Sequence, residues 1–222
     1  MAQFGETVEG YAVPVLNERE IRAAAGILFL ATFLSLMFIL FKGNFIPIKV
    51  VVPVFLGDFL IRVFISPRYA PTLVLGRLIV GRQRPEWVAA KPKQLAWFIG
   101  VALSAVMFVL MVAMNTYSPV TGIICLVCLV FLFFESAFGI CLGCLFYSLV
   151  YREPPTLCPG EVCEPATRLK VQRASTAQVL GLLAFAALVG AATVAFQGPL
   201  AAKPRPLFGA AAEALHESAA AR

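Results

Sequence analysis

The chain alternates between long apolar runs and short polar segments. Five of the runs reach or exceed the ~20 residues that a bilayer-spanning helix needs, namely about 23–41, 45–66, 95–115, 120–151 and 176–197. This pattern predicts an all-α fold, a polytopic transmembrane helix bundle of about five spans. The predicted divisions are an N-terminal tail (1–22), a four-span membrane core (23–151), a cysteine-containing segment (152–175), a fifth transmembrane helix (176–197) and a C-terminal tail (198–222).

The start of the first span carries a local signal. Asn17 is followed three residues later by Glu20, which resembles a capping box and predicts a helix beginning near Glu18. The first 22 residues are polar and contain no signal-peptide core or cleavage site, so we expect the first span to be retained.

Two of the runs depart from a simple span. The second contains Pro47 and Pro53, which predict irregular structure near its start. The run 120–151 is longer than one crossing needs, and either tilt or a break around 135–139 accommodates the excess.

The segment between the second and third spans mixes apolar and basic residues. Leu73 to Val80 is mostly apolar, and Arg77, Arg82 and Arg84 are interspersed with it or follow it. This pattern is typical of a short helix lying at the cytoplasmic interface, although an ordinary basic loop fits it as well.

Composition and charge agree with a membrane protein. Hydrophobic residues make up 60% of the chain and charged residues only 14%, against about 25% charged in soluble domains, which excludes a soluble enzyme. The net charge of +6 comes from basic residues beside the apolar runs, so it predicts contact with lipid headgroups and not with nucleic acid.

The basic residues also predict the orientation. The N-terminal tail and the segments 67–94 and 151–176, which lie on one side of the membrane if there are five spans, together hold 12 Lys and Arg residues. The segments expected on the other side hold 5: residues 42–49, the turn 116–119 and the C-terminal tail. The first group is therefore expected in the cytoplasm, which places the N-terminus there and the C-terminal tail outside.

All six cysteines fall in three close pairs between positions 125 and 163. Cys125 and Cys128 lie within an uninterrupted apolar run, so we interpret them as packing residues.

Cys141 and Cys144 have a different setting, because Glu135 and two glycines surround them. If a helix restarts after Gly139, its positive N-terminal end lowers the pKa of a thiol and favours a reactive thiolate. The alternative is a small-residue packing face, since Gly139 and Gly143 form a G-x-x-x-G motif.

Cys158 and Cys163 lie in the polar segment that follows and form a possible relay with Cys141 and Cys144. Four cysteines are also compatible with one zinc ion, although the second spacing is loose, and our expectation is no metal. A purely structural disulfide is disfavoured if this face is in the reducing cytoplasm.

Three ionisable residues lie within the apolar runs: Asp58, Arg62 and Glu135. An unpaired charge in a bilayer is costly, so such residues either pair or serve a function. Either Asp58 and Arg62 pair at i, i+4 beside a protonated Glu135, or all three form a carboxylate–guanidinium–carboxylate cluster.

The sequence lacks the residues that several kinds of cofactor site require. His216 in the tail is the only histidine, which excludes a bis-histidine haem in the membrane and a histidine-rich metal site. The sequence has no glycine-rich phosphate loop with its lysine. We therefore expect no cofactor.

Four stretches together carry a family resemblance: LNEREIRAAAG, P-x4-DFLIRVFISPRYAP, KPKQLAWFIG and ESAFGICLGCLFY. Over about residues 12–151 the chain resembles the bacterial membrane family called domain of unknown function 4395. By resemblance, Asp58, Arg62, Glu135, Cys141 and Cys144 occupy its motif positions. The family's association with thioredoxin-like and sulfurtransferase-like proteins implies thiol or sulfur chemistry and such a protein as partner.

The sequence thus predicts a bacterial inner-membrane protein whose Cys141 and Cys144 exchange disulfides or carry sulfur. Whether it is an enzyme stays open. One alternative is a non-enzymatic accessory subunit of a membrane complex, favoured by Ala186 and Gly190 four residues apart on the fifth span. Another is a carrier for a small sulfur compound.

Overall fold

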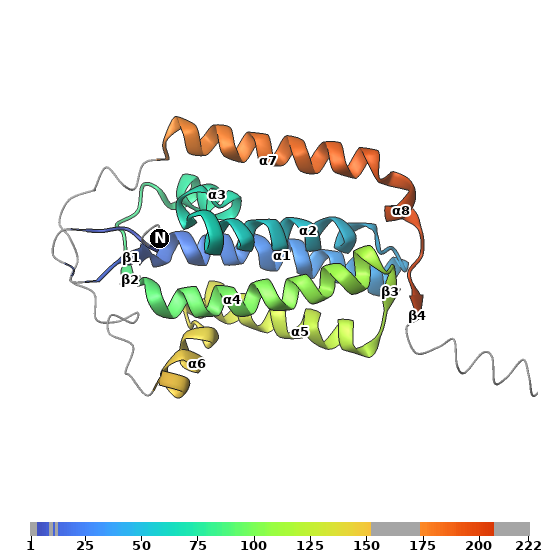
Figure 1. Cartoon of the computed structure of the whole chain (residues 1–222), viewed down its shortest axis with the longest axis horizontal. Coiled ribbons are helices and arrows are strands. Elements are labelled where there is room, and N and C mark those ends of the chain that lie inside the picture. The colour runs from blue at the N-terminus through green and yellow to red at the C-terminus, as the bar shows by residue number, and fades with distance from the viewer. Residues whose placement is uncertain (1–3, 9–10, 12, 152–173, 207–222) are drawn as a thin grey trace, which may run out of the picture.

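The computed structural model describes residues 4–8, 11, 13–151 and 174–206. Four long helices lie side by side in a bundle: α1 (Glu18–Lys42), α2 (Ile46–Leu60), α4 (Ala90–Met107) and α5 (Pro119–Phe133). A fifth, α7 (Thr176–Ala195), runs along the outside (Figure 1). The predicted all-α polytopic bundle is confirmed.

Three of the long helices continue into a π-helical turn. These turns are η1 (Ile61–Ile65) after α2, η3 (Phe108–Ala113) after α4 and η4 (Phe134–Phe138) after α5. Within the described residues, four helices are long and apolar enough to cross a membrane: Glu18–Lys42, Ala90–Ala113, Pro119–Phe138 and Thr176–Ala195. Helix α2 runs beside them but carries two charged residues, Lys49 and Asp58. The turn η1 that continues it carries a third, Arg62.

Helix α1 begins where the sequence predicted. The Asn17 side chain accepts a hydrogen bond from the Arg19 N–H at 3.2 Å, and its amide donates to Glu20 at 3.1 Å. At the other end Gly43 adopts a left-handed conformation, with φ of 59°, that closes the helix.

The irregularity predicted near the start of the second span was wrong. Pro47 lies in the first turn of α2, where a missing N–H is tolerated, and Pro53 is contained within the helix. The irregular part is at the other end, where η1 is followed by extended backbone at Ser66.

The segment between α2 and α4 folds into the 3-10 turn η2 (Pro67–Tyr69) and the helix α3 (Pro71–Val80). Helix α3 packs on α1 so closely that a Cβ on Gly76 would lie 2.6 Å from the Glu20 carbonyl oxygen. Leu78 and Ile79 on its other face are exposed. The predicted short helix is confirmed.

Part of the predicted N-terminal tail is built into the bundle end. Strand β1 (Val15–Asn17) pairs antiparallel with β2 (Trp87–Ala89), with Leu16 opposite Val88. Val15 and Trp87 are buried there. This pairing joins the start of α1 to the segment that precedes α4.

The opposite end of the bundle is held by the segment after α7. The short helix α8 (Gln197–Ala201) brings its carbonyls to Lys49, whose ammonium donates to Pro199 and Leu200 at 3.3 Å. Strand β4 (Arg205–Pro206) then pairs in parallel with β3 (Thr116–Tyr117). The chain therefore crosses from the β1–β2 end to the β3–β4 end along α7 (Figure 1).

Candidate functional site

The run 120–151 is broken, as one of the two sequence interpretations predicted. Gly139 has φ of 68°, and its N–H bonds to Glu135, closing η4. Helix α6 (Leu142–Tyr151) then starts in a new direction (Figure 1). A single tilted helix is thereby excluded, because the left-handed residue ends the first one.

Cys141 lies immediately before α6 and is bonded to Cys144 as a disulfide, with Cα atoms 5.2 Å apart. The Cys144 N–H donates both to the Cys141 carbonyl at 3.0 Å and to the Cys141 sulfur at 3.2 Å. The Cys141 sulfur therefore occupies the place of a helix-capping acceptor, at the positive end of α6.

Both sulfurs lie at a buried position, since Cys141 is 9% and Cys144 7% exposed. A cavity of about 70 Å³ reaches Cys141 from within the bundle, and its lining includes Arg62, Glu135 and Cys128. The two sulfurs are thus at bonding distance and buried, and this small cavity is lined in part by Cys141.

Gly143, between the two cysteines, is in tight contact with α4. A Cβ there would lie 2.4 Å from the Cβ of Ala96, so the position admits only glycine unless a helix moves. Gly139 differs, because its positive φ of 68° favours glycine, and a Cβ there would meet only the flexible Arg22 side chain of α1, at 3.3 Å. Of the proposed G-x-x-x-G face, Gly143 therefore packs on the backbone of α4, whereas Gly139 lies against a side chain of α1.

Cys125 and Cys128 lie on α5 as free thiols. Cys125 is buried among the apolar side chains of α2 and η3, including Ile48, Val52 and Met111. This environment agrees with the packing interpretation. The relay and the four-cysteine zinc alternative depend on Cys158 and Cys163, which lie outside the described residues.

The three predicted charges Asp58, Arg62 and Glu135 fall into two separate groups, and the first is the predicted pair of Asp58 and Arg62. The Arg62 Nε donates to an Asp58 carboxylate oxygen at 2.7 Å, and both residues are almost fully buried. Thr72, at the start of α3, donates its N–H and hydroxyl to Asp58 and accepts from Arg62 at 2.6 Å. The guanidinium also lies 4.6 Å from the centre of the Phe59 ring and 5.1 Å from that of Trp97. This group fastens α3 to α2.

Glu135 belongs to the second group, so the predicted three-residue cluster with Arg62 was wrong. Its carboxylate pairs with Lys93, in the first turn of α4, and Lys93 also lies 2.8 Å from Glu18 at the start of α1. Lys93 is only 3% exposed. One ammonium thus joins three helices just before the chain turns at Gly139, and Arg22 donates to the Ala137 carbonyl beside it at 3.2 Å.

Sequence reasoning missed Lys93, Glu18 and Thr72 as partners. Lys93 and Glu18 were counted with the polar flanks of the apolar runs, whereas Glu135 was placed near the middle of the run 120–151, at the depth of Asp58 and Arg62. The break at Gly139 instead puts Glu135 near the end of its span, so this glycine was the available signal. No group of three or more histidine, cysteine or acidic residues that could hold a metal occurs among the described residues.

Comparison with known proteins gives a family but no close relative. No curated protein and no solved structure matches the chain. A family model, the domain of unknown function DUF4395, matches residues 16–152, which include the disulfide and both charge groups but not α7. The chain belongs to the DUF4395 family.

Proposed function

We propose that this protein exchanges disulfides with a partner through Cys141 and Cys144. The observation that carries the proposal is the Cys141 sulfur at the start of α6, bonded to Cys144 and accepting the Cys144 N–H. In the reduced form, the same N–H and the helix dipole stabilise a Cys141 thiolate.

The reaction proceeds in two thiol–disulfide steps. The Cys141 thiolate attacks a disulfide of the partner, forms a mixed disulfide and releases one partner thiolate. Cys144 then loses its proton and attacks the Cys141 sulfur, which re-forms the internal disulfide and releases the second partner thiolate. Two electrons pass from the Cys141–Cys144 dithiol to the partner, and the reverse sequence reduces the pair. A thioredoxin-like protein has the required dithiol.

The proposed location is a bacterial inner membrane, with the N-terminus and the disulfide at the cytoplasmic face. Four apolar helices support the membrane location. The orientation is supported by arginines at the bundle end where α1 begins next to β1 and β2 (Figure 1): Arg19 and Arg22 lie in the first two turns of α1, and Arg77 pairs with Glu20 there. Cytosolic disulfides are usually transient and catalytic, which agrees with an exchange role.

Trapping of the mixed disulfide tests the proposal. Cys144→Ser removes the resolving thiol, so a covalent adduct with a partner should accumulate and disappear on reduction. Cys141→Ser should form no adduct, and Cys125→Ser should cycle like the natural protein. In all three, a thiol-alkylating mass tag reports the redox state in cells.

The alternative is an accessory subunit in which these cysteines only pack. The burial of both sulfurs and the close approach of Gly143 to Ala96 favour it. Under that alternative Cys144→Ser and Cys141→Ser both yield no adduct and are tolerated as well as Cys125→Ser. Sulfur carriage instead predicts a persulfide on Cys141, detectable by the mass of the isolated protein.

A further inference from the structure

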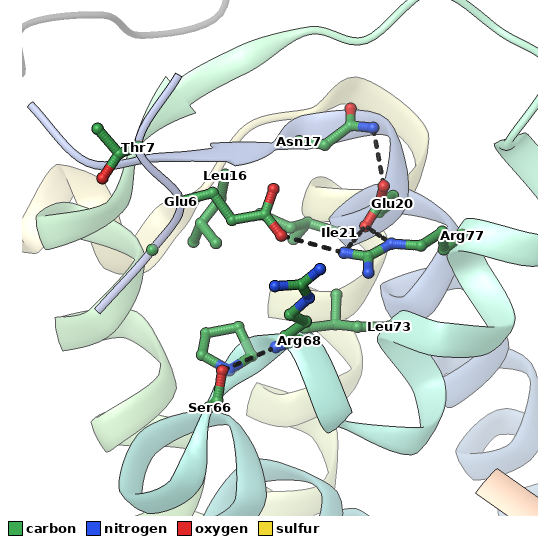
Figure 2. Close-up of a pocket in the computed structure, with 12 residues that line it drawn as sticks. Glu6, Thr7, Leu16, Asn17, Glu20, Ile21, Ser66, Arg68, Leu73 and Arg77 are labelled. Carbon is green, nitrogen blue, oxygen red and sulfur yellow. Dashed lines mark hydrogen bonds and ion pairs between the residues drawn. The ribbon is translucent and has the colours of Figure 1, made fainter. Parts of the chain in front are cut away.

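A second cavity, separate from the disulfide, opens at the β1–β2 end of the bundle. It has a volume of about 300 Å³ and lies between the N-terminal segment, the start of α1 and the η2–α3 segment (Figure 2). This volume is at the lower end of the range for small-molecule sites, about 300–1,000 Å³. Four of the lining residues are charged: Glu6, Glu20, Arg68 and Arg77.

Glu20 and Arg77 neutralise each other. One Glu20 oxygen accepts from the Arg77 Nε at 3.0 Å and lies 2.9 Å from Nη2, and the other oxygen accepts from Asn17. Both side chains are more than nine-tenths buried. The Arg77 Nη1 is also buried but has no hydrogen-bond partner, so this guanidinium keeps one unused donor at the wall of the cavity.

Glu6 and Arg68 have weaker partners in the cavity. The Glu6 carboxylate forms a long ion pair with Arg77, 3.6 Å from Nη2 and too far for a hydrogen bond (Figure 2). Arg68 is exposed, forms no ion pair with any described residue, and extends into the space below Glu6 in Figure 2. Beyond the Glu20–Arg77 pair, the cavity therefore presents one carboxylate and one guanidinium.

This charge pattern selects among ligands. The Glu6 carboxylate repels a simple anion, and the Arg68 guanidinium repels a simple cation. A neutral molecule with an ammonium and an acid group a few atoms apart satisfies both charges at once.

We propose that this cavity binds a small zwitterion, with its primary ammonium at Glu6 and its acid group at Arg68. Two sources share this chemistry: a free α-amino acid, and the phosphoethanolamine headgroup of a lipid. Helix α3, which lines the cavity through Leu73 and Arg77, also carries the exposed Leu78 and Ile79, which provide an apolar surface for lipid chains.

Binding to the full chain in detergent tests the proposal. We expect phosphoethanolamine or alanine to bind measurably by isothermal titration calorimetry, and ethanolamine and inorganic phosphate, each with only one of the two charges, to bind at least tenfold more weakly. Glu6→Gln and Arg68→Gln should each weaken zwitterion binding at least tenfold. Arg82→Gln, an exposed arginine that does not line the cavity, is the matched control and should leave it unchanged.

The same binding experiment distinguishes a free amino acid from a lipid headgroup as the ligand. Preference for alanine indicates a free amino acid. Preference for phosphoethanolamine indicates the headgroup, and thermal stabilisation should then be greater in phosphatidylethanolamine vesicles than in phosphatidylcholine vesicles, whose quaternary ammonium cannot donate a hydrogen bond. The proposal is overturned if neither zwitterion binds, if phosphate alone binds as tightly as phosphoethanolamine, or if both cavity variants bind like Arg82→Gln. None of these results depends on the cysteines.

Discussion

Asp58 and Arg62 show what a single buried pair contributes. Arg62 is held by Asp58, Thr72 and two aromatic rings. Arg62→Leu leaves the Asp58 charge buried with Thr72 alone, so it should lower the free energy of unfolding by about 3–5 kcal/mol. Arg62→Leu combined with Asp58→Leu should cost less, because no charge is left unpaired. Thermal unfolding in detergent measures both, and equal losses in the single and double variants would contradict this account.

Of the ion pair between Lys93 and Glu135, the replacement of Lys93 should destabilise the protein more. Lys93→Met removes the cation that pairs with both the buried Glu18 and the partly buried Glu135, whereas Glu135→Gln leaves Lys93 still paired with Glu18. We therefore expect Lys93→Met to lower the unfolding temperature more than Glu135→Gln. A smaller effect of Lys93→Met, measured by the same unfolding assay, would show that the three charges do not act together.

The two charge groups also show how far the sequence predicts a site. Asp58 and Arg62 are one helical turn apart, so their pairing follows from helix geometry. Lys93 and Glu135 are 42 positions apart, and their contact depends on how α4 packs against the end of α5. Local spacing carries no information on that packing, so neither sequence interpretation paired Glu135 with Lys93: one grouped Glu135 with Arg62, and the other left it protonated.

The break between α5 and α6 depends on two glycines with different requirements. Gly143→Ala places a Cβ 2.4 Å from the Ala96 Cβ and 2.8 Å from its Cα, so α6 must move away from α4. The expected cost is about 1–3 kcal/mol, as for overpacked cores. Gly139→Ala forces a left-handed conformation on alanine, at a similar cost of about 1–3 kcal/mol.

Gly122→Ala on α5 is the control for both changes, because its Cβ meets nothing within 4 Å. This variant should be stabilised by about 0.5–1 kcal/mol through the better helix propensity of alanine. Unfolding temperatures compare the three variants. If all three change alike, helix propensity alone accounts for the effects and the tight α4–α6 contact is not required.

At the level of whole elements, the sequence predicted the helices better than the connections. The apolar runs located the long helices, and Gly139 marked the break between two of them. The β1–β2 pairing was not predicted, since Val15–Asn17 and Trp87–Ala89 are three-residue strands without an alternating pattern. Their pairing depends on the bundle bringing the start of α1 next to the start of α4.

The folded protein should lose stability as the pH rises through the titration of Glu6. Burial raises the pKa of Glu6 above its ordinary value of 4.5, although Arg77 and Arg68 oppose the shift and Glu20 adds to it. Between the ordinary and the raised pKa, the folded chain keeps a proton that the unfolded chain has lost, so the free energy of unfolding falls with increasing pH. Glu6→Gln should flatten this part of the stability profile, and Glu86→Gln, outside the cavity, should not. An unchanged slope in Glu6→Gln would assign the dependence to another group.

The orientation of the whole molecule is the remaining prediction, and it rests on charge and on connectivity together. The segments expected on the side of the N-terminus hold 12 Lys and Arg residues, and those expected on the other side hold 5. This asymmetry predicts that the β1–β2 end is cytoplasmic. With the break at Gly139 we expect 120–151 to cross once, and α7 then carries the chain to the β3–β4 end (Figure 1), where the Lys203 carbonyl accepts a hydrogen bond from Asn115. A reporter fused after Arg84 should therefore be active only in the cytoplasm, and one fused after Lys203 only outside. Two reporters on the same side would mean that one of the helices between the two fusion sites, α4, α5 or α7, does not cross. A reversed result at Arg84 would place the disulfide in an oxidising compartment, where a stable structural bond replaces an exchanging one as the simpler role.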